Sequence, residues 1–91
     1  MKFTLLPLIV SAVVLAGCAK DSELQCTTAA KDTWQNEQAF QDSLIAKGYV
    51  IDKFKVTPGN CYEIYGQDAQ KAKVEIYFNP VDGSIVKEEK K

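Results

Sequence analysis

The chain has 91 residues, 46% of them hydrophobic and 25% charged, which allows one globular domain at most, because so short a chain cannot bury two separate cores. Its formal net charge is −1, all eleven cationic residues are lysines, and there is no histidine. This balance argues against a nucleic-acid partner, which needs a strongly basic face, and against an enzyme, which usually takes its general base from histidine.

The chain begins with a sequence typical of export. Residues 5–16 form an apolar run that fits a secretory signal and is shorter than the ~20 residues of a membrane-spanning helix. The run ends in residues 15–18 (LAGC), which resemble a bacterial lipobox and predict lipidation at Cys18, the mature N-terminus. Ordinary cleavage after Ala19, with loss of Cys18, stays open as the alternative.

Both interpretations place the protein on the periplasmic side of a bacterial envelope. A lipid on Cys18 would anchor it in a membrane, and Ala19 in the next position favours the outer membrane. Without the lipid, the protein would be soluble in the periplasm. Residues 1–18 are accordingly predicted to be the signal with its lipobox, and residues 19–33 a polar tether.

The other two cysteines are predicted to form a disulfide. Cys26 and Cys61 are an even pair in a chain bound for an oxidising compartment, where such bonds persist. Closing their loop would remove unfolded-chain entropy worth about 3 to 4 kcal/mol, so folding should depend on the bond. A redox-active pair is disfavoured because the Cys-x-x-Cys spacing is absent.

The sequence after the tether predicts one amphipathic helix over residues 35–47. Phe40, Leu44 and Ile45 would form its apolar side, and Gly48 suits the left-handed position that ends a helix. Trp34 is predicted to pack between the Cys26 segment and this helix.

Four strands should follow, over residues 50–57, 61–66, 73–79 and 84–87, separated by polar loops or by proline and glycine turns. In the first strand the inward residues should be Val50, Phe54 and Val56, unless a bulge brings Ile51 inward. The charged tail, which includes residues 89–91, should fray.

The predicted fold class is therefore α+β. One N-terminal helix should pack on an antiparallel meander of three or four strands, stapled by the disulfide, with residues 34–88 as the domain.

The sheet face away from the helix is the candidate partner-binding surface. Strand alternation places Glu63, Tyr65, Glu75 and Tyr77 together on it, and aromatic side chains beside charges suit a protein interface. We expect this face to be exposed to solvent. The alternative is a merely solvated sheet face, and the two glutamates are not predicted to act as a catalytic pair or to bind a metal; no cofactor is predicted.

Several stretches resemble a small, stand-alone PepSY-domain protein, over nearly the whole mature chain. The residues that carry the resemblance are Trp34, the helix with Ala39 and Phe40, Gly48-Tyr49, residues 61–66 (CYEIYG) and residues 74–86 (VEIYFNPVDGSIV). The strand followed by x-Pro-x-x-Gly-x-hydrophobic is the most typical part. Asn79 departs from the acidic residue often found before that turn, so any role that needs charge there is in doubt.

The resemblance implies binding rather than chemistry. The family takes its name from the propeptides of thermolysin-like metallopeptidases, and its members are proposed to restrain peptidases in the envelope or outside the cell. The partner implied is an envelope or secreted protein, a peptidase in particular, inhibited in trans. The alternative is a small-ligand-binding or structural accessory of the envelope, which should respond to an envelope metabolite or lipid and to no peptidase.

Overall fold

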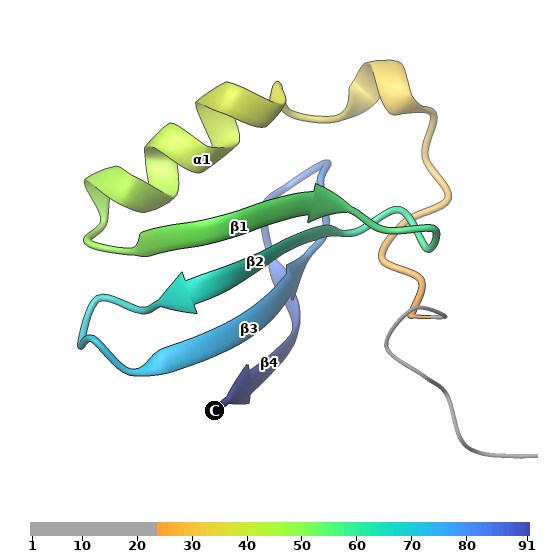
Figure 1. Cartoon of the computed structure of the whole chain (residues 1–91). Helices are drawn as coiled ribbons and strands as arrows, with labels where there is room; N and C mark the ends of the chain where they lie inside the picture. The colour runs from red at the N-terminus through yellow and green to blue at the C-terminus, as the bar shows by residue number, and fades with distance from the viewer. Residues whose placement is uncertain (1–23) are drawn as a thin grey trace, which may run out of the picture.

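The structure is a computed structural model, and it describes residues 24–91; the predicted signal and the lipidation at Cys18 lie outside them. A 3-10 turn, η2 (Lys31–Thr33), precedes one helix, α1 (Glu37–Ala46). The strands β1 (Val50–Val56), β2 (Tyr62–Gln67), β3 (Lys73–Phe78) and β4 (Ile85–Lys90) form one antiparallel sheet in the order β1-β2-β3-β4 (Figure 1). The predicted α+β fold, with four strands, is confirmed.

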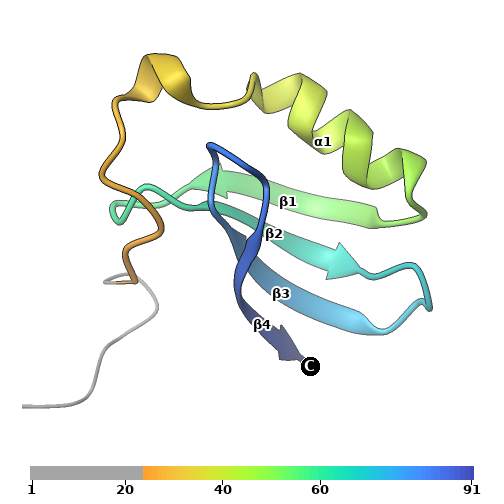
Figure 2. The same cartoon turned by 180° about the vertical axis from the view of Figure 1, so that it is seen from behind.

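The helix begins and ends for local reasons. The Asn36 side chain accepts a hydrogen bond from the backbone N–H of Ala39 at 2.9 Å, which caps the first turn. At the other end Gly48 has φ 99°, and its N–H donates to the carbonyl of Ile45 at 2.9 Å. The predicted stop at glycine is confirmed. α1 then lies over the β1 side of the sheet, as both views show (Figures 1 and 2).

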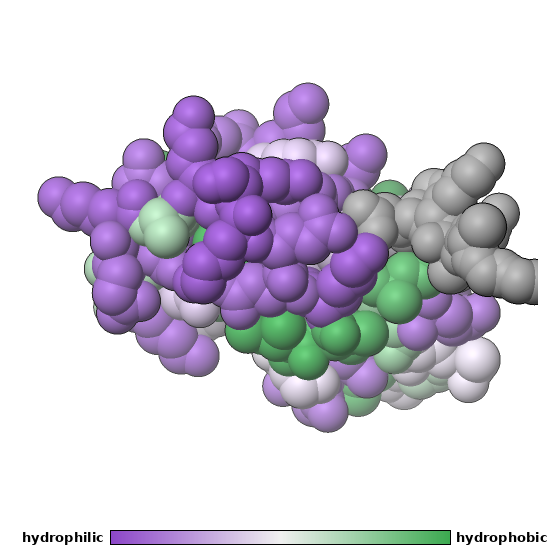
Figure 3. All heavy atoms as spheres, turned by 90° about the horizontal axis from the view of Figure 1, so that it is seen from below, coloured by the Kyte–Doolittle hydropathy of each residue, from purple (hydrophilic) through white to green (hydrophobic). Residues whose placement is uncertain are grey.

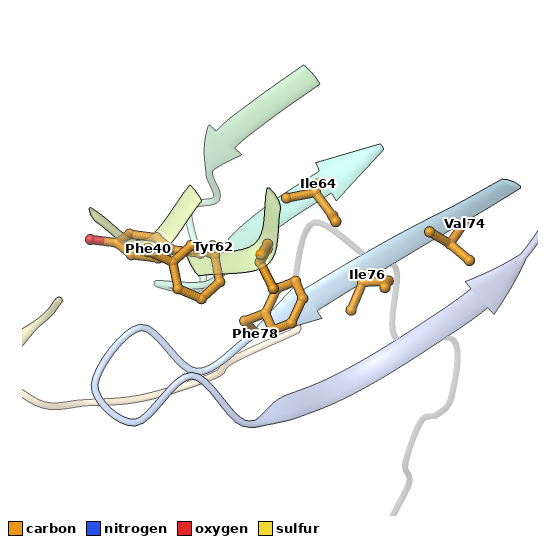
Figure 4. Close-up of a cluster of buried hydrophobic side chains, with 7 residues drawn as sticks. Phe40, Tyr62, Ile64, Val74, Ile76 and Phe78 are labelled. Carbon is orange, nitrogen blue, oxygen red and sulfur yellow. The ribbon is translucent and has the colours of Figure 1, made fainter. Parts of the chain in front are cut away.

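The core lies between α1 and one face of the sheet. Its buried side chains are Phe40, Leu44, Tyr62, Ile64, Val74, Ile76 and Phe78. The Phe40 ring lies 5.0 Å from those of Tyr62 and Phe78, and Figure 4 shows Ile76 and Val74 following along β3. Ile45, predicted on the apolar side of the helix, is exposed instead. Since the core uses every second residue of β2 and β3, the residues between them point away from α1.

A β-bulge in β1 changes which residues face inward. The register between β1 and β2 shifts between Ile51 and Lys53, so Ile51 packs against the core and Val50 is 47% exposed. Gly66 lies against the bulge, and a Cβ atom there would come within 1.9 Å of the Val50 carbonyl oxygen. The bulge that the sequence left open therefore occurs, and glycine permits the close approach of the two strands.

The C-terminus is ordered, so the expectation of a frayed tail is wrong. β4 continues to Lys90, and the N–H of Lys91 donates to the carbonyl of Lys73 at 2.9 Å. The ammonium of Lys90 also donates to the buried carboxylate of Asp68 at 2.9 Å. Charged residues at a chain end usually fray because they have no fixed partner. Here a neighbouring strand and a buried carboxylate supply the partners.

The segment before α1 is attached to the end of the sheet that carries the turn between β1 and β2. The predicted Cys26–Cys61 disulfide is present, across a sequence separation of 35, and the N–H of Cys26 donates to the carbonyl of Gly59 at 2.9 Å. Trp34 donates from its indole N–H to the carbonyl of Ala29 at 3.1 Å and contacts the ring of Tyr62 edge-on. In Figures 1 and 2 this segment passes the end of the sheet where β1 finishes.

Candidate functional site

The structure brings the four candidate residues together on the sheet face away from α1. Glu63 pairs with Tyr77 across β2 and β3, and Tyr65 pairs with Glu75 two residues further along. Side chains directly opposite and diagonally related on two such strands contact one another. The four side chains therefore form one patch, which we call the open-face patch.

Two neighbouring hollows mark this face. The first, the Glu63 hollow, has a volume of about 290 Å³ and is lined by the four residues of the open-face patch with Lys55, Thr57 and Pro58. The second, the Lys73 hollow, has a volume of about 190 Å³ and is lined by Asp52, Tyr65, Gly66, Lys73, Val74 and Lys91. Tyr65 lines both, so it stands between them. Seen from the side away from α1, the surface is mainly hydrophilic, with a smaller group of hydrophobic atoms (Figure 3).

The expected solvent exposure of the patch is wrong for three of its four residues. Glu63 and Tyr77 are 2% exposed and Glu75 is 4% exposed, whereas Tyr65 is 36% exposed. Strand alternation fixes which face a side chain points to, but says nothing about what covers it. The cover comes from long neighbouring side chains, and Lys55, from edge strand β1, has its ammonium 3.8 Å from a Glu63 carboxylate oxygen.

Glu75 is the centre of a hydrogen-bond network. The Tyr77 hydroxyl donates to one of its oxygens at 2.6 Å, and the ammonium of Lys91 lies 2.9 Å from the other. Burial alone would raise the pKa of Glu75, but hydrogen bonds from Tyr77, Glu63, Lys91 and Tyr65 outweigh burial and lower this pKa to about 2. The same contact with Glu75 raises the pKa of Tyr65 to about 12. Glu75 is thus held as an ionised acceptor.

Glu63 behaves in the opposite way. Burial raises its pKa, and its hydrogen bond with Glu75 raises this pKa further. The two pKa shifts run in opposite directions, so Glu63 is the more readily protonated of the two carboxyl groups. Two carboxyl groups with separated pKa values are also the arrangement of acid–base catalysis. Both groups are buried at the base of the Glu63 hollow and contact neighbouring side chains.

The carboxyl pair makes the stability of the domain depend on pH in two directions. The pKa of Glu75 is lowered from 4.5, so its contribution is present above pH 4.5 and is lost as pH falls towards about 2. The pKa of Glu63 is raised from 4.5, so its contribution is present below 4.5 and is lost as pH rises through the higher folded-state value. Thermal melts measured across pH test this dependence. Glu75→Gln should reduce the loss of stability at low pH, and Glu63→Gln should reduce the loss of stability as pH rises. Two variants with the pH profile of the unmodified protein would contradict this assignment.

Sequence reasoning missed the residues that complete the two hollows. Lys73 could have been found, because it has the same strand parity as Glu75. Lys91 could not, because the tail was expected to fray. Nor did the sequence indicate a third hollow, of about 560 Å³, which the N-terminal segment forms with α1 and the sheet; it is lined by Lys31, Trp34, Gln35, Asn36, Glu37, Val56 and Tyr62.

Residues 24–91 also bear on metal binding and on membrane crossing. No group of three or more cysteine, aspartate or glutamate side chains in this range is placed to hold a metal ion. Within the same residues, no helix has the length and apolar character needed to cross a membrane.

Comparison with known proteins identifies the family. The family model described as "Peptidase propeptide and YPEB domain" matches residues 1–89. No curated protein and no solved structure gives a significant match to the chain. The family match extends over α1 and over all of the sheet except Lys90, the last residue of β4, and it includes the residues of the open-face patch. The chain therefore belongs to the PepSY family of peptidase propeptide and YPEB domains.

Proposed function

We propose that this protein is a non-catalytic domain of the bacterial envelope that binds a peptidase carried on a separate chain and restrains it. The family match over residues 1–89 is the observation that carries the proposal, because the family is associated with peptidase propeptides. Propeptides of this kind act by contact with the peptidase and need no chemistry of their own. The buried, fully engaged carboxyl pair is consistent with such a role.

The proposed contact surface is the open sheet face, with Tyr65 at its centre. Tyr65 is the exposed member of the open-face patch and lies between two hollows that could receive side chains of a partner. Tyrosine is enriched in protein interfaces, because its ring buries a large area and its hydroxyl can still hydrogen-bond. Glu63, Glu75 and Tyr77 would then support this surface from below.

The proposed location is the periplasmic face of the envelope, with a lipid on Cys18 as the anchor. The lipobox-like residues 15–18 support the proposal, and Ala19 favours the outer membrane. The intact mass of the mature protein tests it: a lipidated N-terminal cysteine supports the anchor, and an unmodified chain that begins after residue 19 excludes it.

Crosslinking in the native host tests the proposed function. A photoreactive residue replaces Tyr65 in one strain and Lys47, exposed at the end of α1, in a control strain. Mass spectrometry should identify a peptidase captured from position 65 and absent from position 47. Capture of no peptidase from position 65, or equal capture from both positions, would overturn the proposal; a thermal shift with an envelope metabolite would then favour a small-ligand role.

A further inference from the structure

We propose that the open sheet face recognises an extended, acidic segment of its partner, through Lys53, Lys55 and Lys73 arranged around Tyr65. The inference rests on the proposed function and specifies the chemistry of the partner's contact segment.

Most of the charges on this face are separated by depth. Lys53, Lys55 and Lys73 are exposed, whereas the carboxyl groups of Glu63 and Glu75 lie beneath them, 2% and 4% exposed. The acidic groups that also reach this surface are Asp52, beside the Lys73 hollow, and Glu89, whose carboxylate is paired with Lys87 and Lys91. Ammonium groups therefore dominate the charge that a partner meets first, although the whole chain has a formal net charge of −1. A face with this charge attracts acidic partners and disfavours basic ones.

The three lysines are placed to act on one ligand. Lys53 is paired with Tyr65 across β1 and β2, and its ammonium lies 5.9 Å from the centre of the tyrosine ring. Lys55 lines the Glu63 hollow and Lys73 lines the Lys73 hollow, on the two sides of Tyr65. The side chain of Lys55 is 56% exposed and its contact with Glu63, at 3.8 Å, is long for an ion pair, so it can turn to a new partner at small cost.

The shape of the face favours an extended peptide. Alternate side chains of an extended chain point to the same side and are about 7 Å apart. A segment that crosses Tyr65 can thus place one side chain in each hollow, with its carboxylates beside the lysines at the rims. Anionic lipid headgroups would meet the same charges, but a bilayer surface offers no side chains to fill two separate hollows. We therefore assign the surface to a peptide segment.

NMR titration of the disulfide-bonded protein tests the chemistry directly. The probe is an octapeptide of alternating glutamate and threonine, with a lysine–threonine peptide as its control, at low and high salt. Backbone amide shifts should concentrate around Lys53, Lys55, Tyr65 and Lys73 with the acidic peptide, and should fall at high salt. Equal shifts with the basic peptide would overturn the inference. So would binding of the same face to phosphatidylglycerol vesicles without binding to the acidic peptide, which would indicate a membrane surface.

Charge reversal separates this inference from the proposed function. A variant with Lys53→Glu, Lys55→Glu and Lys73→Glu should bind the peptidase captured from position 65 about tenfold more weakly or worse. A matched control with Lys31→Glu, Lys47→Glu and Lys71→Glu has the same change in net charge at exposed positions outside the two hollows of this face, and should bind nearly as the unmodified protein does. If both variants bind the peptidase equally well, the inference is wrong and the proposed function stands. If the acidic peptide binds and no peptidase is captured, the inference stands and the proposed function is wrong.

Discussion

Reduction of the Cys26–Cys61 disulfide is expected to lower the free energy of unfolding by about 3 to 4 kcal/mol. The bond closes a loop across 35 residues and thereby limits the conformations of the unfolded chain. A domain of this size rarely gains much more than that from its core, so the reduced protein should be largely unfolded at physiological temperature. Thermal melting followed by circular dichroism, with and without reductant, measures the effect.

A variant with Cys26→Ser and Cys61→Ser provides the control. Its melting temperature should match that of the reduced protein and should not respond to reductant. If the unmodified protein melts at the same temperature in both conditions, the disulfide has no part in the stability of the domain.

Replacement of Tyr77 by alanine is expected to cost about 3 to 5 kcal/mol of stability, as for other buried aromatic residues. Tyr77 is 2% exposed and donates the 2.6 Å hydrogen bond to Glu75, so its removal leaves both a cavity and a carboxylate short of a donor. Tyr65→Ala should cost about 1 kcal/mol or less, because Tyr65 lies at the surface. Strand parity places both tyrosines on the face away from α1, so from the sequence both substitutions would be expected to leave stability nearly unchanged. Because Tyr77 is buried, its replacement should instead be strongly destabilising.

Urea unfolding of the two variants measures the difference, and Tyr77→Phe separates its causes. The phenylalanine keeps the ring and removes the hydroxyl, so its cost should be about 1 to 3 kcal/mol, between those of the other two variants. If Tyr77→Ala and Tyr65→Ala unfold at the same urea concentration, the buried role of Tyr77 is wrong. Binding assays of the open sheet face should therefore use Tyr65→Ala, which keeps the fold.

Local rules were sufficient for most of the fold. Gly48 ends the helix because the left-handed conformation costs glycine little, and the periodicity of residues 73–79 specifies a strand with two distinct faces. Both features depend on residues that are close in sequence. The same is true of the assignment of Glu63 and Glu75 to one face.

Contacts between distant residues account for what the sequence did not show. The bulge near Ile51 depends on Gly66 in the next strand, which has room for the displaced backbone. The burial of Glu75 depends on Lys91, sixteen positions away, whose side chain was expected to be free at the chain end. No pattern in the sequence around Glu75 predicts that Lys91 is its partner. Burial of the open-face patch therefore had to be seen in three dimensions.

The attachment of the N-terminal segment would also constrain where a lipid-anchored form of the protein can work. Leu24 lies against Gly59 in the β1–β2 turn, next to Pro58 at the edge of the Glu63 hollow. If Cys18 carries the lipid, the six residues from there to Leu24 reach at most about 20 Å. The domain would then be held by this corner close to the bilayer, and the Glu63 hollow would stay within a short distance of the lipid headgroups. A partner that uses it would have to be a protein that also operates at the membrane surface.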